Sequence, residues 1–257
     1  MIWRVVPVVL NCVAMIIASS LNGGDGWPVE FNAGLFNVHA DYDPQSLRSP
    51  EIVGTLANLP NEVAQTLGIQ IGAEEVHLIL FSRGQEYREY LSKHFPGIVP
   101  RQAMFIRRGG PGMVFAYQSD QLATDLRHES THALLNGSLP YVPLWMDEGI
   151  AEYFEAPAHE RVSRHPHYRQ VCRRSRFVRP PEVHDLENID KLPGMDANAY
   201  RDAWSIIHFL IHESEQSRDV LIRFMMDLQA HSPPGQFSRR LDQELPDWRD
   251  RFRTHFR

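Results

Sequence analysis

The sequence predicts a single domain of the α+β class, with a strand-rich layer over residues 27–118 and a helical layer over residues 119–257. Two patterns support this prediction. Short apolar segments separated by turn residues dominate the first half, whereas apolar residues recur at helical spacing in the second. The pattern changes near residue 119 without a linker, and 43% hydrophobic residues in a chain of 257 are enough for a buried core. We therefore expect one mixed domain over residues 27–257.

Four segments of the first half have the pattern of strands. The first alternates between apolar and polar residues, the second is a continuous apolar run, and the last two flank the turn sequence Gly-Gly-Pro-Gly, as expected of a hairpin. These segments are residues 36–43, 75–82, 103–108 and 112–118. Helical spacing is found over residues 45–68, where Pro60 interrupts it, and over residues 84–95.

Five helices are predicted in the second half. Ser119 or Asp120 is suited to cap the first of them, and Gly137 is suited to end it. The second helix is expected over residues 143–155 and the third over residues 197–213, with two more in the remaining C-terminal part. No internal repeat or low-complexity tract interrupts this half.

The first twenty residues predict export. They carry one charge, Arg4, within a long apolar run that ends in small residues and a glycine-rich stretch, which is typical of a secretory signal. An uncleaved N-terminal membrane anchor is the alternative, since the run is intermediate in length. Either way we expect a periplasmic, cell-surface or secreted protein. Cys12 lies in this segment, so Cys172 is the single cysteine beyond it and no internal disulfide can form there.

The charge balance gives no reason to expect nucleic-acid binding. The formal net charge is -6 and the isoelectric point about 6.1. One segment departs from this balance, because residues 161–179 contain seven arginines and no acidic residue. Such a run could contact an anionic substrate, a carboxyl terminus or a membrane surface. A solvated segment is the favoured interpretation, because neither interleaved aromatic residues nor phosphate-binding glycines accompany it.

The segment "HESTH" places two histidines four residues apart. On a helix, His128 and His132 would lie on one face, one turn apart, so both imidazoles could bind one ion. Glu129 lies beside them and could face a metal-bound water without being a ligand. This H-E-x-x-H pattern is typical of zinc hydrolases, although chance would place it in roughly three chains in a hundred.

A catalytic zinc ion needs a third protein ligand and an open fourth position. Fifteen residues separate His132 from Glu148, enough for one helix to end and a second to return antiparallel. Glu152 lies one turn further on the same face and could accept a hydrogen bond from the remaining N–H of a ligand histidine. His128 is the favoured candidate for that histidine. Gly149 would allow the two helices to approach closely. The alternative is a solvated acidic helix face.

The segments "HESTH" and "LWMDEGIAEYFE" together resemble the gluzincin metallopeptidases of the peptidase MA clan. There, a Trp-Leu-x-Glu-Gly-x-Ala helix follows the H-E-x-x-H helix and donates the third zinc ligand. The pair is also similar to an exported bacterial family of unknown function with H-E-x-x-H and E-G-x-A-E-Y-F-E motifs. The resemblance covers roughly residues 100–215. It implies a zincin-like, thermolysin-type fold with one Zn²⁺ ion bound by His128, His132 and Glu148. The loop between the H-E-x-x-H helix and the glutamate helix is shorter than in the aminopeptidase branch, and the Gly-Ala-Met-Glu-Asn strand is absent. Aminopeptidase activity is therefore not implied.

The resemblance also implies a Tyr or His donor that stabilises an oxyanion. In "NAYRDAWSIIHFLIH", Tyr200 lies at the start of a predicted helix, similar to the Tyr-x-x-Gly helix of related peptidases, with Ala203 in the small-residue position. An ordinary packing role for Tyr200 is the alternative.

Two further pairs of histidines are more simply explained by packing. His208 and His212 are again four residues apart, but apolar neighbours surround them and no acidic residue lies beside His208. We therefore expect a core or partly exposed pair rather than a second metal site. His165 and His167 flank a proline in a predicted loop, and no metal is expected there either.

These residues predict a zinc-dependent peptidase that acts on a peptide or protein substrate. Glu129 would be the general base, and the strand containing Met113, Val114 and Phe115 could pair with an extended substrate. The alternative is an exported zinc-binding or interaction module that keeps the fold without catalysis. A chance motif within a helical interaction domain is a third possibility.

Overall fold

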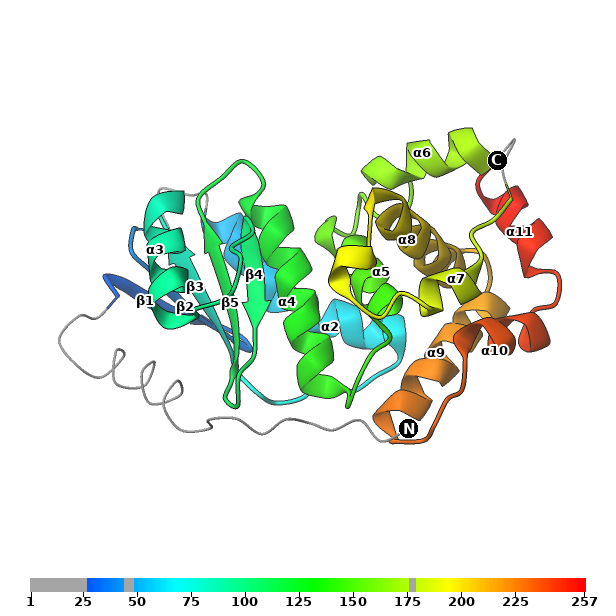
Figure 1. Ribbon diagram of the computed structural model, residues 1–257, viewed down its shortest axis with the longest axis horizontal. Coiled ribbons are helices and arrows are strands. Elements are labelled where there is room, and N and C mark those ends of the chain that lie inside the picture. The colour runs from blue at the N-terminus through cyan, green and yellow to red at the C-terminus, as the bar shows by residue number, and fades with distance from the viewer. Residues whose placement is uncertain (1–26, 44–48, 176–178) are drawn as a thin grey trace. The chain divides into compact units, whose positions relative to one another are not determined.

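The computed structural model describes residues 27–43, 49–175 and 179–257, which form two compact units. The sheet unit comprises the described residues up to Ala57 and Ala73–Leu126, and the helical unit comprises those of Asn58–Gly72 and Arg127–Arg257. A five-stranded sheet thus precedes a helical half, as the sequence predicted (Figure 1). The segment predicted as a signal or anchor, residues 1–20, lies outside the described residues. Within the described ranges, no helix has both the length and the apolar character needed to cross a membrane.

The sheet has the strand order β1-β2-β3-β5-β4. Its strands are β1 (Val29–Ala33), β2 (Phe36–Ala40), β3 (Val76–Phe81), β4 (Ala103–Ile106) and β5 (Gly112–Tyr117). The three central strands β2, β3 and β5 are parallel, and an antiparallel strand lies on each side of them. The hairpin predicted from the Gly-Gly-Pro-Gly turn is confirmed, because β4 and β5 pair antiparallel with Ala103 opposite Ala116.

The register of β5 corrects one prediction. This strand is hydrogen-bonded to β3 on one side and to β4 on the other. Met113, Val114 and Phe115 are also almost completely buried. A substrate peptide therefore cannot add to this strand, and the prediction that these three residues bind substrate in that way is wrong. The edges of the sheet are formed by β1 and β4.

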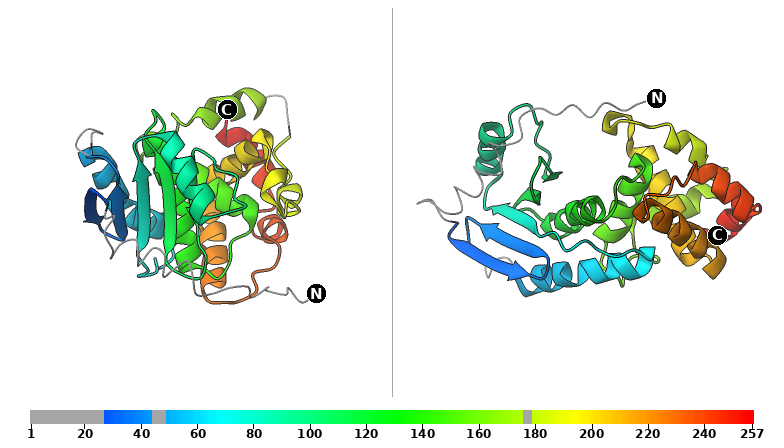
Figure 2. Two further views of the ribbon diagram at one scale, coloured as in Figure 1. Left: turned by 60° about the vertical axis from the view of Figure 1, so that its left-hand side comes forward. Right: turned by 90° about the horizontal axis from the view of Figure 1, so that it is seen from below.

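The predicted helix after β3 is present as α3 (Gly84–His94), and it lies against one face of the sheet (Figure 2). Tyr87 and Leu91 of this helix pack with Phe81 and Phe115 of the strands in one apolar cluster. The other helix of the first half, α2 (Ser49–Leu67), runs through Pro60 without the predicted interruption. Three of its apolar side chains, Leu59, Val63 and Leu67, are completely buried, and this packing offsets the single backbone hydrogen bond that proline removes.

The helical unit contains more helices than the sequence predicted. They are α4 (Leu122–Ser138, from Arg127 onward), α5 (Leu144–Glu155), α6 (Pro166–Ser175), α7 (Val183–Glu187), η2 (Leu192–Gly194), α8 (Ala197–His212), α9 (Glu215–Gln229), α10 (Phe237–Glu244) and α11 (Trp248–His255). Part of the arginine-rich segment is helical, as α6, and three helices rather than two follow α8. Gly137 lies inside α4 instead of ending it.

Helix α8 contacts α5, α6, α7 and α9 (Figure 1). Asp196 caps its first turn by accepting backbone N–H bonds from Asn198 and Ala199. The closest approach involves Gly149 of α5, because a Cβ atom there would lie 2.9 Å from the backbone carbon and oxygen of Ala203. Gly149 therefore permits contact between α5 and α8, whereas the sequence had suggested contact between α5 and α4.

Candidate metal centre

His128, His132 and Glu148 lie together in the helical unit, as the sequence predicted. Both histidines project from α4 and the glutamate from α5. The two Nε2 atoms are 3.2 Å apart, and Oε2 of Glu148 lies 3.6 Å from Nε2 of His128 and 3.5 Å from that of His132. Three ligands of a tetrahedral ion with bonds near 2.05 Å lie about 3.3 Å apart. The three side chains therefore form a group that could hold a metal ion.

The burial of Glu148 supports this interpretation. The residue is only 5% exposed, and its Oε2 atom has no hydrogen-bond partner among the described residues. Burial alone would raise the pKa of Glu148, but the contacts with the two imidazoles outweigh it and lower the pKa to about 2. An ionised carboxylate oxygen without a hydrogen bond is costly in a buried place unless a cation neutralises it.

Each of the two histidines contacts a second carboxylate through its other ring nitrogen. Nδ1 of His128 lies 3.1 Å from Oε2 of Glu155. Nδ1 of His132 lies 3.0 Å from Oδ2 of Asp147, at ion-pair distance but outside hydrogen-bond geometry. These contacts orient both Nε2 atoms toward Glu148, which is the usual arrangement around metal-binding histidines.

The carboxylate predicted to orient His128 was the wrong one. Glu155 makes that contact, whereas Glu152 makes its hydrogen bond with Nε2 of His167, at 3.0 Å. Seven residues, the separation of Glu155 from Glu148, correspond to almost two whole helical turns, so the two carboxylates are nearly in line. Glu152, four residues from Glu148, is rotated by about 40° the other way around the helix and faces the start of α6.

The carboxylates raise the pKa values of both histidines. Burial lowers the pKa of His128, but its contacts with the carboxylates of Glu148 and Glu155 outweigh it and raise the pKa to about 9. Burial also opposes protonation of His132, yet Asp147 and Glu148 raise its pKa well above the ordinary value. A divalent cation would compete with protons for these nitrogen atoms.

Two buried arginines hold the C-terminal end of α5, where Glu155 lies. Nε of Arg127 donates to the carbonyl oxygen of Phe154 at 2.7 Å, and Nε of Arg161 donates to that of Ala156 at 2.8 Å. Both guanidinium groups also pair with Glu62. Arg161 is therefore a structural residue, and the interpretation of residues 161–179 as entirely solvated is wrong at this position.

Glu129 is half-buried on α4 between the two histidines in sequence. Tyr200 is half-buried in the first turn of α8, three residues before the contact of Ala203 with Gly149. Their chemical roles stay predictions.

Residues 121–234 match the sequence profile of a family described as proteins of unknown function (DUF1570). The matched range begins at α4 and contains His128, His132 and Glu148. No curated protein matches the chain.

The sequence interpretation missed His165 and His167. His165 is 2% exposed, and its Nε2 atom lies 3.2 Å from Oε1 of Glu155. His165 and His167 contact the carboxylates of α5, Glu155 and Glu152 respectively, and not the predicted ligands. The two histidines flank Pro166 about ten residues after the acidic helix. This closeness in sequence to Glu152 and Glu155 was the only feature that could have predicted the contacts.

The predicted packing role of His208 and His212 is supported. His208 is 1% exposed, and Nε2 of His212 lies 2.9 Å from the hydroxyl oxygen of Tyr153.

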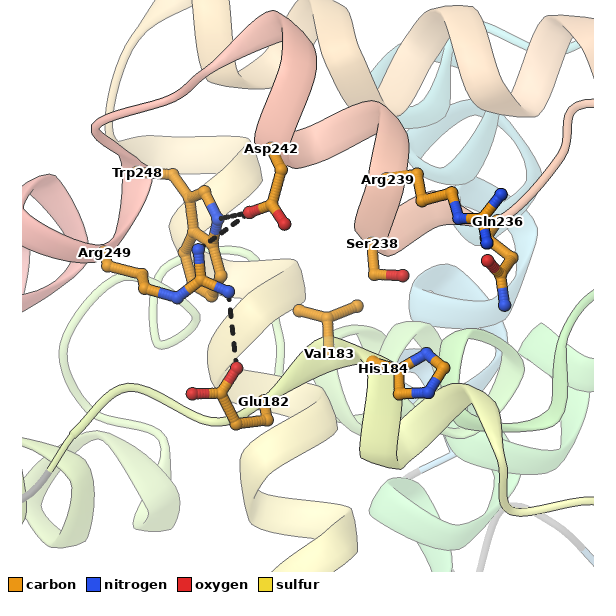
Figure 3. Close-up of a pocket in the computed structure, with 9 residues that line it drawn as sticks. All are labelled: Glu182, Val183, His184, Gln236, Ser238, Arg239, Asp242, Trp248 and Arg249. Carbon is orange, nitrogen blue, oxygen red and sulfur yellow. Dashed lines mark hydrogen bonds and ion pairs between the residues drawn. The ribbon is translucent and has the colours of Figure 1, made fainter.

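A separate hollow in the helical unit has a volume of about 210 Å³ (Figure 3). It is lined by residues of α7, α10 and α11 and of the segments just before them, and its charged groups are largely paired with one another. Arg249 bridges Asp242 and Glu182 at 2.7 and 3.3 Å, and Asp242 also accepts a hydrogen bond from the indole of Trp248. The hollow does not include His128, His132 or Glu148.

Proposed function

We propose that this protein is a zinc-dependent hydrolase that cleaves peptide bonds. The observation that carries the proposal is the triangle formed by two imidazole nitrogens and one buried carboxylate oxygen, with sides of 3.2–3.6 Å. Two histidines and a glutamate are a ligand set that catalytic zinc uses when a fourth position stays open. The resemblance of the two helical motifs to gluzincin peptidases supports the same chemistry.

The residues would divide the work in the following way. When bound, zinc supplies Lewis acidity that activates water and polarises a substrate carbonyl group. Glu129, one residue from His128, takes the proton of the attacking water and delivers it to the leaving amine. Glu155 and Asp147 keep the ligand nitrogens aligned. Tyr200, on this proposal, donates a hydrogen bond to the oxyanion of the tetrahedral intermediate.

The test compares wild type with Glu129→Gln. Metal content is measured by mass spectrometry, and cleavage is measured on a broad peptide library. We expect one zinc ion per chain in both proteins, with cleavage in the variant reduced about 10²- to 10⁴-fold, since Glu129 supplies proton transfer and no ligand atom.

Glu89→Gln is the matched control, because Glu89 is exposed on α3 and the chemical change is the same. It should leave cleavage unchanged. Zinc in wild type without cleavage of any peptide would favour a non-catalytic zinc-binding module. Absence of zinc from wild type would refute the proposed function.

A further inference from the structure

Glu155 is bound by two histidines at once. Its Oε2 atom lies 3.1 Å from Nδ1 of His128, and its Oε1 atom lies 3.2 Å from Nε2 of His165. The second histidine comes from outside both recognised motifs and immediately precedes α6. The chain of contacts therefore runs from His165 through Glu155 to a ligand of the candidate metal centre.

The proton of His165 can be assigned from its neighbours. The backbone N–H of His167 donates to Nδ1 of His165 at 3.2 Å. A backbone N–H can only donate, so Nδ1 must be the unprotonated nitrogen of the neutral ring. The proton then lies on Nε2, which donates it to Oε1 of Glu155.

Packing fixes the plane of the His165 ring. It stacks on Trp204, with centroids 4.7 Å apart and an angle of 16° between the planes, and Trp204 is completely buried. Rotation of the imidazole by 180° about its Cβ–Cγ bond would move both nitrogens away from the backbone N–H and the carboxylate. Stacking fixes the plane of the ring and the two hydrogen bonds select this orientation over the flipped one, so the ring presents its Nε2–H donor to Glu155.

This donor has a consequence for His128. With Oε1 held by His165, the carboxylate of Glu155 presents Oε2 to Nδ1 of His128, and an ionised carboxylate only accepts. Nδ1 of His128 must then carry the proton. The lone pair of the neutral ring is on Nε2, the atom that lies 3.2 Å from Nε2 of His132 and 3.6 Å from Oε2 of Glu148.

We propose that His165 is a positioning residue of the metal centre: through Glu155 it fixes the orientation and the tautomer of His128, and so strengthens binding of a divalent cation. The inference rests on the proposed zinc site. Hydrogen-bonding partners of ligand histidines typically contribute 10- to 100-fold to metal affinity, and for a residue one contact further out we expect about 10-fold.

Two variants separate the donor from the stacked ring. His165→Phe keeps a ring against Trp204 and removes the donor, whereas His165→Gln keeps an N–H donor of similar reach and removes the ring. Zinc affinity of the full chain is measured by competition with a chromophoric chelator. We expect about 10-fold weaker binding for His165→Phe, and recovery of most of that loss in His165→Gln.

Glu155→Gln tests whether the effect passes through Glu155. Adding His165→Phe to Glu155→Gln should then weaken binding no further, since residues that act through a shared partner are not additive. His159→Phe is the control, because the side chain of His159 is 71% exposed, and it should bind zinc as wild type does.

Several results would overturn the inference. Wild-type affinity in His165→Phe would do so, as would equal losses in the Phe and Gln variants, because retaining an N–H donor would then make no difference to zinc affinity. An undiminished effect of His165→Phe in the Glu155→Gln background would exclude the route through Glu155. If wild type bound no zinc at all, the proposed function itself would fail.

Nuclear magnetic resonance of the imidazole nitrogens in wild type gives a test that needs no variant to fold. We expect the proton of His165 on Nε2 and, in the zinc-loaded protein, a proton of His128 on Nδ1 and none on Nε2. A proton on Nδ1 of His165 would contradict the inference.

Discussion

The helical unit contains two pairs of histidines four residues apart, and their surroundings differ. The rings of His128 and His132 on α4 are 4.9 Å apart, and those of His208 and His212 on α8 are 4.7 Å apart. Spacing and ring distance are therefore almost the same. Carboxylates of α5 surround the first pair, whereas the ring of His208 packs against aromatic rings and its Nε2 atom donates to the carbonyl oxygen of Val162.

The pKa values respond to this difference. Burial is the largest influence on both His128 and His208, and it lowers the pKa in each case. Two carboxylates reverse its effect at His128 and raise the pKa to about 9, whereas His208, beside His212 and without a carboxylate, has a pKa of about 3. Helical spacing brings two imidazoles together, but carboxylates from a neighbouring helix decide whether their surroundings favour a positive charge.

The largest expected effect comes from removing one histidine of each pair. His132→Ala should weaken zinc binding by well over the roughly 100-fold typical of losing a hydrogen-bonding partner, because it removes a ligand atom. His212→Ala should leave zinc affinity unchanged. Chelator competition measures both. Equal zinc affinity in the two variants would mean that the carboxylates do not distinguish the pairs.

Much of this contrast was predictable from local sequence. His128, Glu129 and His132 are fixed by one helical turn, and the distance to Glu148 allows a return helix. Contacts between distant segments were not predictable. The choice of Glu155 over Glu152 depends on how α5 is rotated against α4. The contact of His165 with Glu155 depends on the course of the chain after α5.

The fold shows the same division. The hairpin of β4 and β5 was readable because its turn is local, whereas the interior position of β5 follows from pairing with β3, about 35 residues earlier in the chain. Pro60 was expected to interrupt α2, but the helix runs through it. The prediction failed because the identity of one residue does not reveal the packing that stabilises the helix around it.

An intermediate effect, on the free energy of unfolding, is expected from Gly149→Ala. Gly149 lies on α5, the helix that carries the carboxylates and also contacts α8. A Cβ atom there would lie 2.9 Å from backbone atoms of Ala203, so Gly149→Ala forces α5 and α8 apart. We expect a loss of about 1–3 kcal/mol in the free energy of unfolding, measured by denaturant titration. Gly54→Ala is the control, because among the described residues no atom beyond its chain neighbours and its own helix backbone lies within 4 Å of the added methyl group. In a helix that substitution should stabilise by roughly 0.5–1 kcal/mol. Similar changes in the two variants would show that α5 does not depend on this contact.

The smallest expected effect is the change in the free energy of unfolding per pH unit that His208 causes. It tests the histidine pair that has no carboxylate beside it. Its pKa is about 3 in the folded protein, because burial and the neighbouring His212, His255 and His165 disfavour the charged form, whereas the pKa of an unfolded histidine is about 6.5. Between these values the unfolded chain binds a proton that the folded chain does not. The stability contributed by a neutral His208 is thus fully present above about pH 6.5 and is lost as the pH falls, by about 1.4 kcal/mol per pH unit.

His208→Gln isolates this contribution, because glutamine retains a donor for Val162 and does not titrate. Denaturant titrations at pH 7.5, 6.0 and 5.0 should show wild type losing stability relative to the variant as the pH falls. His159→Gln, at an exposed position, should follow wild type throughout. A constant difference between wild type and His208→Gln across this range would mean that His208 has the same pKa in the folded protein as in the unfolded chain. Burial beside other histidines would then not keep His208 neutral.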